Sequence, residues 1–164
     1  MEHVHDYLSI GGGMAADAAA KAIREVDAAA NVGIVGAEAP PPYQRPPLSK
    51  ALWKGDKSVA DIDLATAQSG ATLHLGRRIE SLDRVAHIAR DDHGDTYRYR
   101  RLLLATGATP RRLPFDGGER VIHFRTLDDY QALRRYAKPG AYIAVVGGGF
   151  IGSELAASLS SVGC

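Results

Sequence analysis

Residues 7–16 read YLSIGGGMAA, and this stretch decides the fold. Residues 7–10 are a short β-type run, and an alanine-rich segment over residues 14–30 follows the three glycines. Alanine has the best helix propensity, so we expect a helix there. The β-branched residues within 31–35 then predict a second, buried strand. This order of elements predicts a right-handed βαβ unit, which places the chain in the α/β class.

The glycine loop has the spacing Gly-x-Gly-x-x-Ala, formed by Gly11, Gly13 and Ala16. The first glycine permits a tight turn, the second lets a pyrophosphate approach the backbone, and the small third residue lets helix and strand pack closely. The start of the helix favours an anion. Glu38 follows the second strand, where a carboxylate can accept both hydrogen bonds of a ribose diol. The pattern predicts a dinucleotide site, although such loops often serve only as turns.

A second loop of the same kind lies near the end of the sequence. Residues 147–152 read GGGFIG, after an apolar run over residues 142–146 that predicts a strand and before a segment that predicts a helix. Residues 126–138 have helical spacing, with Thr126 as a plausible cap. Two such loops indicate two nucleotides or two dinucleotide-binding domains.

Between the two loops lie a proline-dense stretch and a predicted β-meander. Residues 40–50 read PPPYQRPPLSK, which excludes a helix or a central strand and is also typical of a linker or a polyproline II ligand. Ser49 is a candidate cap for a short helix through Trp53. Short strands are expected over residues 79–82, 85–89 and 96–99, and a fully apolar one over residues 102–106.

The composition excludes several classes of protein. The 164 residues include 20 basic and 19 acidic side chains, which gives no electrostatic case for nucleic acid or anionic membranes. The single cysteine, Cys164, excludes a disulfide scaffold and a Cys-x-x-Cys redox pair and fits a reducing, cytoplasmic setting. His3 and His5 could bind a metal, but we expect a mobile N-terminus instead and predict no metal site.

Four motifs in order resemble a known family. They are Gly11-Gly12-Gly13, residues 43–50 (YQRPPLSK), residues 104–111 (LATGATPR) and residues 147–154 (GGGFIGSE). They resemble the FAD-dependent pyridine nucleotide-disulfide oxidoreductases, in the ferredoxin reductase and apoptosis-inducing factor-like branch. The resemblance implies an FAD/NAD(P)-binding Rossmann-like domain with a β-meander insertion over residues 1–115. The start of a second Rossmann-like, NAD(P)-binding domain would follow over residues 116–164, so the chain is expected to be an N-terminal fragment.

The resemblance also implies roles for individual residues. The residues that would bind FAD are Gly11, Gly12, Gly13, Met14, Ala15, Ala37, Glu38, Arg45, Lys50, Ile79, Thr106, Gly107 and Arg111. The residues that would bind NADH or NADPH are Gly147, Gly149, Phe150, Ile151, Gly152 and Glu154. Lys50 and Glu154 would form the catalytic ion pair beside the flavin and the nicotinamide. In apoptosis-inducing factor an acidic residue stands where this chain has Ala37, so that contact would be lost or shifted to Glu38.

The implied activity is a flavoprotein reductase. It would take hydride from NAD(P)H onto FAD and pass electrons to a [2Fe–2S] ferredoxin-type protein, a rubredoxin or another acceptor. The lack of Cys-x-x-Cys separates the chain from the disulfide-reducing branches. An alternative is an incomplete FAD-binding fragment or a redox-sensing flavoprotein without turnover. We expect little turnover from the 164 residues alone.

Overall fold

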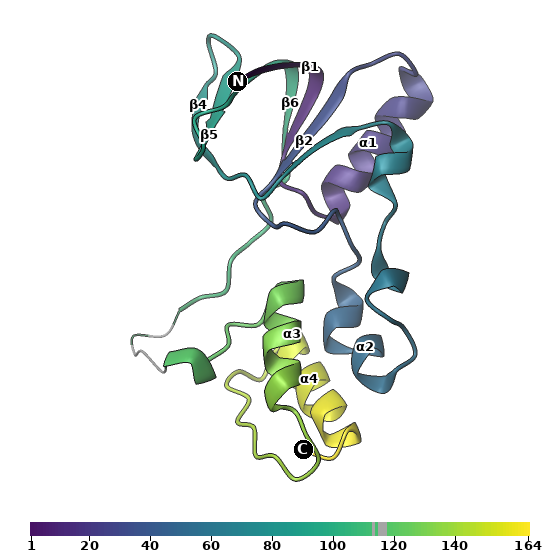
Figure 1. Cartoon of the computed structure of the whole chain (residues 1–164), viewed down its shortest axis with the longest axis vertical. Coiled ribbons are helices and arrows are strands. Elements are labelled where there is room, and N and C mark those ends of the chain that lie inside the picture. Colours follow the sequence, from purple (N-terminus) through teal and green to yellow (C-terminus); the bar gives the residue numbers. More distant parts are fainter. Residues whose placement is uncertain (113, 115–117) are drawn as a thin grey trace. The chain divides into compact units, whose positions relative to one another are not determined.

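The computed structural model describes residues 1–112, 114 and 118–164, which form two compact units (Figure 1). The first unit contains Met1–Gln44 and Asp63–Gly107, and the second contains Arg45–Ile62 and Ala108–Cys164. Each unit is therefore built from two separate stretches of the chain. The predicted domain boundary between residues 115 and 116 lies outside the described residues.

The first unit is built on a six-stranded sheet with the strand order β3-β2-β1-β6-β5-β4. Its elements are β1 (Glu2–Ile10), α1 (Met14–Val26), β2 (Val32–Gly36), η3 (Thr66–Ser69), β3 (Thr72–Leu75), β4 (Ile79–Asp83), β5 (Ile88–Asp91) and β6 (Thr96–Leu104). Strands β3, β2, β1 and β6 are parallel, whereas β5 and β4 continue the sheet as an antiparallel meander. The predicted βαβ unit and meander are confirmed, and with them the Rossmann-like class.

Alanines let α1 pack closely on the sheet. Ala16 and Ala20 of α1 are buried against Val32 and Ile34 of β2. A second cluster joins the meander to the parallel strands, because Tyr97 of β6 is fully buried in the same cluster as Leu8 and Ile10 of β1. Small side chains on the helix and large ones under the meander thus produce two apolar layers.

Three strand predictions differ from the structure. Residues 96–104 form one strand, β6, in place of the two expected over residues 96–99 and 102–106, because β1 pairs along its length despite the polar Arg101, which lies opposite Tyr7. The expected strand over residues 85–89 begins only at Ile88, because the Asp83 carboxylate accepts both the Val85 and the Ala86 amides at 2.9 Å and makes a turn. Strand β3 had no separate prediction, since its four residues carry little periodicity.

The expected mobile N-terminus is wrong. Strand β1 begins at Glu2, and its side chains His3 and His5 lie against His74 of β3, with Nε2 of His5 3.2 Å from Nε2 of His74. Gly33 of β2 leaves the room for this contact, since a Cβ there would stand 2.6 Å from the His5 ring. Strand β2 lies between β1 and β3 in the sheet, and at Gly33 it carries no side chain that would separate His5 from His74.

This histidine cluster makes the first unit sensitive to acid. Burial, together with the charges of His3 and His5, lowers the pKa of His74 from 6.5 to about 4. The unfolded chain therefore binds more protons than the folded chain between those values, so the free energy of unfolding falls as the pH is lowered from 6.5 towards 4. After allowance for solvent screening we expect a loss on the order of 1–2 kcal/mol.

Denaturant titrations between pH 7 and pH 4 measure this loss. His74→Phe keeps a ring but removes the titrating group, so its unfolding free energy should depend less on pH. His93→Phe, in the exposed turn before β6, is the matched control and should keep the slope of the unmodified chain. If the unfolding free energy has the same pH dependence in the unmodified chain, His74→Phe and His93→Phe, the assignment of the acid sensitivity to His74 is wrong.

The second unit is helical in the described residues. Its elements are η1 (Pro46–Ser49), α2 (Ala51–Lys54), η2 (Ala60–Ile62), η4 (Gly118–Arg120), α3 (Leu127–Tyr136) and α4 (Phe150–Ser161). The rings of Trp53 and Tyr130 meet edge to face at 5.1 Å in its core, and Arg134 covers the Trp53 ring. The predicted cap Thr126 is confirmed as part of a capping box with Asp129. Ser49 caps no helix; it ends η1, and Lys50 stands at the start of α2.

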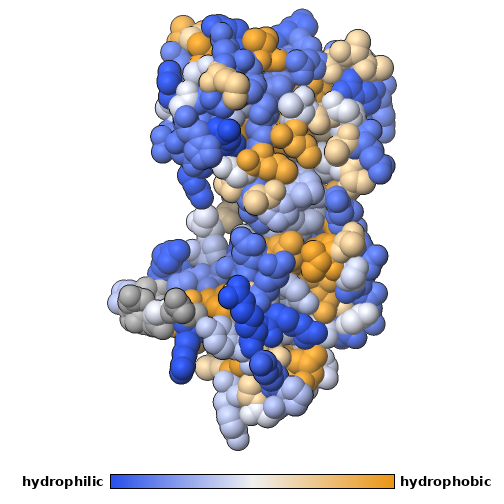
Figure 2. All heavy atoms as spheres, in the orientation of Figure 1, coloured by the Kyte–Doolittle hydropathy of each residue, from blue (hydrophilic) through white to orange (hydrophobic). Residues whose placement is uncertain are grey.

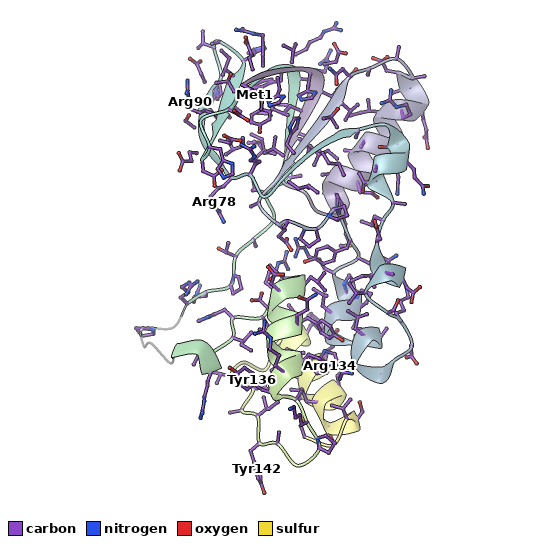
Figure 3. All side chains as sticks on the ribbon, in the orientation of Figure 1. Met1, Arg78, Arg90, Arg134, Tyr136 and Tyr142 are labelled. Carbon is purple, nitrogen blue, oxygen red and sulfur yellow. The ribbon has the colours of Figure 1, made fainter. Side chains whose placement is uncertain are left out.

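The strand predicted over residues 142–146 is wrong. This segment has no strand assignment, and Tyr142 projects from the ribbon (Figure 3) with its whole side chain exposed. A strand needs a hydrogen-bonded neighbour, and the described residues of this unit contain no other strand to pair with it. Exposed apolar residues appear among hydrophilic ones in both units (Figure 2). The large apolar side chains of Val146 and Phe150 are exposed.

Candidate functional site

In the first glycine loop, only glycine fits at position 11, whereas Gly13 borders open space. Gly11 has φ +117°, and a Cβ there would lie 2.1 Å from the Ala105 carbonyl oxygen. A Cβ on Gly13 would meet nothing within 4 Å. Gly13 is the residue before α1, and among the described residues no side chain caps that helix. The loop therefore packs tightly against β6 at its start and is open at its end, in front of the first amides of α1.

Four further predicted residues lie around this loop. Ala105, just after β6, donates its amide to the Ile10 carbonyl at 2.8 Å, which brings Thr106 and Gly107 past the glycines. Gly107 has φ +69° and ends the first unit. Met14 and Ala15 are exposed in the first turn of α1. The start of α1 and the segment after β6 therefore both lie at the first glycine loop.

Glu38 is held in place by a residue that the sequence analysis did not single out for this role. The Tyr43 hydroxyl, on a side chain only 5% exposed, donates to Oε2 of Glu38 at 2.5 Å. The Glu38 carbonyl accepts the Gly76 amide at 3.0 Å, which places the segment leading to Ile79 beside it. Ala37 is exposed. The carboxylate predicted to accept a ribose diol is thus partly buried and fixed at the carboxyl end of β2.

The remaining predicted residues belong to the second unit. Arg45 donates from Nη1 to the Arg125 carbonyl at 3.3 Å, and Arg111 is exposed. Lys50 also belongs to this unit. The structure therefore groups the predicted FAD residues within two units rather than one.

The second glycine loop repeats the local geometry of the first. Gly147 has φ +121°, and Gly147, Gly148 and Gly149 have nothing within 4 Å of an added Cβ. A Cβ on Gly152 would lie 2.0 Å from the Gly147 carbonyl oxygen, so this position also requires glycine. Phe150 and Ile151 begin α4 with exposed side chains. The loop is open at the start of its helix.

Lys50 and Glu154 form an ion pair, as the resemblance implies. Nζ of Lys50 lies 2.9 Å from Oε1 of Glu154, and the two side chains are 52% and 29% exposed. The other carboxylate oxygen, Oε2, accepts the Ser49 hydroxyl at 2.6 Å. These contacts, led by the Ser49 hydrogen bond, lower the pKa of Glu154. Ser49 was proposed from the sequence as a cap only, because its partner lies on α4, far along the chain.

The arrangement consists of two glycine loops, each open at the start of a helix, and one fixed charge pair. No group of three or more His, Cys, Asp or Glu side chains suited to a metal occurs in residues 1–112, 114 and 118–164. Over the same residues no helix is long and apolar enough to cross a membrane.

The chain is similar to known reductases. It is 41% identical to the ferredoxin–NAD(+) reductase component of the anthranilate 1,2-dioxygenase system of Burkholderia cepacia, over 96% of this chain and 40% of that protein. It is 35% identical to a putative mitochondrial apoptosis-inducing factor 1 of Drosophila melanogaster, over 94% of this chain and 26% of that protein. The solved putidaredoxin reductase–putidaredoxin complex matches with a TM-score of 0.84 and 29% identity, over 97% of this chain and 40% of that one.

The chain thus spans less than half the length of these relatives. A family model for the pyridine nucleotide-disulphide oxidoreductases matches residues 5–164. Nearly the whole chain is covered by this match, so the chain belongs to the pyridine nucleotide-disulphide oxidoreductase family.

Proposed function

We propose that the chain is the N-terminal part of an NAD(P)H-dependent flavoprotein reductase that passes electrons to a ferredoxin-type or rubredoxin acceptor. The observation that carries the proposal is the Lys50–Glu154 ion pair at 2.9 Å, which joins the proline-dense motif to the helix behind the second glycine loop. Neither residue alone distinguishes a site from a surface charge. Their pairing near an open helix start supports the proposal, since it would set a fixed charge pair beside a bound nucleotide.

The first unit fits FAD. The open space at Gly13, together with the uncapped start of α1, suits a pyrophosphate. Glu38, oriented by Tyr43, would bind the ribose hydroxyls, and the segment leading to Ile79 lies beside it for the adenine. Thr106 and Gly107 would line the cofactor where β6 ends.

The second loop fits a nicotinamide dinucleotide. Gly147 and Gly149 leave the backbone open, and Phe150, Ile151 and Gly152 begin the helix whose amides would face the pyrophosphate. We infer that residues 1–115 belong to an FAD-binding domain and residues 116–164 to an NAD(P)-binding one.

Lys50 and Glu154 have distinct tasks in this proposal. The chemistry that bound FAD would supply is acceptance of a hydride and one-electron transfer to an acceptor. The Lys50 ammonium would stabilise the negative charge that develops during hydride transfer, since a positive group already in place needs no reorganisation. Glu154 holds that ammonium through Oε1, and Glu154 would accept a hydrogen bond from the nicotinamide carboxamide. The lowered pKa of Glu154 keeps its carboxylate ionised to a lower pH than an ordinary glutamate.

The acceptor follows from the relatives' names and from the cysteine content. The similar proteins are a ferredoxin–NAD(+) reductase component and a putidaredoxin reductase. The single cysteine provides no Cys-x-x-Cys pair that could relay electrons within this chain. A separate one-electron carrier is therefore the acceptor we propose.

A comparison of acceptors tests this function. The product of the coding sequence extended to the length of the relatives should oxidise NADH or NADPH rapidly with a [2Fe–2S] ferredoxin or a rubredoxin present, and at least about tenfold more slowly with oxygen alone. A flavin that is reduced by neither nucleotide would instead favour a redox-sensing flavoprotein without turnover. The 164-residue chain by itself should show little turnover.

A further inference from the structure

The serine before Lys50 holds the carboxylate that Lys50 binds. Oε1 of Glu154 pairs with Lys50, and Oε2 accepts the Ser49 hydroxyl at 2.6 Å. Two consecutive residues thus bind the two oxygens of one carboxylate. They can do so because η1 ends at Ser49 and Lys50 has φ −132° and ψ −97°, outside the helical region, before α2 begins.

Ser49 is itself fixed by α4. Its carbonyl oxygen accepts the Ser158 hydroxyl at 2.8 Å, and both serines are at least 95% buried. Ser158 stands one turn after Glu154 on α4, so the helix contacts Ser49 at two points on the same face. Ser49 donates its hydroxyl to one residue of α4 and accepts through its carbonyl from another.

Two acceptors lie within reach of the Ser49 hydroxyl, the Pro46 carbonyl and the Glu154 carboxylate, and the carboxylate is the better one. The Pro46 carbonyl lies 3.4 Å from Oγ, against 2.6 Å for Oε2 of Glu154. A hydroxyl donates one proton, and a hydrogen bond to an ionised carboxylate is shorter and stronger than one to a neutral carbonyl. The proton therefore belongs on the bond to Glu154.

We propose that Ser49 is a positioning residue, which fixes the rotamer of Glu154 so that Oε1 faces the Lys50 ammonium. The importance of Ser49 for hydride transfer rests on the proposed function. The hydrogen bond between Ser49 and Glu154 does not depend on that function. The charged group that acts on Glu154 is Lys50, from the junction of η1 and α2. Without the Ser49 hydroxyl, the carboxylate loses one of its two partners and turns more freely about its side-chain bonds.

The titration of Glu154 in the 164-residue chain tests this proposal without any cofactor. Carbon-detected NMR should show the Glu154 carboxyl titrating at a higher pH in Ser49→Ala than in the unmodified chain. Ser161→Ala is the matched control, because Ser161 lies on the same helix and donates to the Ser158 carbonyl instead. It should leave the Glu154 midpoint unchanged.

A folding check and a second variant complete the experiment. Trp53 is the single tryptophan, and its Nε1 donates to the Leu48 carbonyl next to Ser49, so its indole resonance reports whether each variant keeps the local fold. Ser49→Thr retains a hydroxyl and should keep the low Glu154 midpoint. An unchanged midpoint in folded Ser49→Ala, or an equal rise in Ser49→Thr or Ser161→Ala, would overturn the proposal. If the Glu154 midpoints change as predicted but the unmodified extended protein shows no turnover, the proposed function is wrong and the positioning role of Ser49 stands.

Discussion

Gly11→Ala should destabilise the first unit by about 3–5 kcal/mol, most of what a domain of this size has. Two costs add at this position. Gly11 has φ +117°, which L residues rarely adopt, and its Cβ would stand 2.1 Å from the backbone oxygen of Ala105. The oxygen belongs to the segment that continues β6, which is paired with β1, so it cannot move aside without breaking the sheet. Denaturant unfolding followed by circular dichroism measures the loss.

Gly13→Ala is the control within the same loop. Gly13 has φ −107° and ψ −169°, which alanine adopts freely, and an added Cβ meets nothing within 4 Å. Its unfolding free energy should stay within about 0.5 kcal/mol of the unmodified chain. The added methyl would occupy the space proposed for the pyrophosphate, so FAD affinity in the extended protein should fall at least about tenfold. Equal stability of the two variants would contradict the packing account, and unchanged FAD affinity in Gly13→Ala would contradict the cradle.

Lys50→Met should slow flavin reduction by NADH in the extended protein by about 100-fold, because removal of one fixed group that stabilises developing charge has an effect of that size. Substrate affinity should change less, since the charge appears only as hydride moves. Stopped-flow absorbance under anaerobic conditions separates the two, because the limiting rate and its dependence on NADH concentration are measured together.

Lys54→Met provides the matched control for this substitution. Lys54 ends the same short helix, α2, and its side chain is exposed. The variant changes the net charge equally and should reduce flavin at the unmodified rate. If Lys50→Met and Lys54→Met are equally fast, Lys50 is a surface charge and its catalytic assignment is wrong.

The parts predicted from the sequence are those with local causes. Glycine spacing and alanine content were sufficient for the end of β1, the loop and α1, although β1 begins at Glu2. Thr126 forms the expected local cap, together with Asp129. Residues 142–146 have strand composition, yet a strand also requires a neighbour, which composition does not report. For the same reason residues 96–104 were divided in two, although pairing with β1 makes them one strand.

The site shows the same limit. Lys50 and Glu154 were paired through family resemblance, and the structure confirms that they meet. Ser49, Tyr43 and His74 were missed in their observed roles, because each acts through a residue on another element. A hydroxyl next to a motif lysine has no periodic signature. Such contacts become visible only once the elements are packed.

The central claim is tested most directly by the visible spectrum of the extended protein, recorded anaerobically before and after addition of NADH or NADPH. The account predicts a yellow protein with the absorption of oxidised flavin, released on denaturation as FAD, that bleaches within seconds of adding one of the nucleotides. A colourless protein, or a bound flavin that neither nucleotide bleaches, would contradict it and leave Lys50 and Glu154 as a structural ion pair.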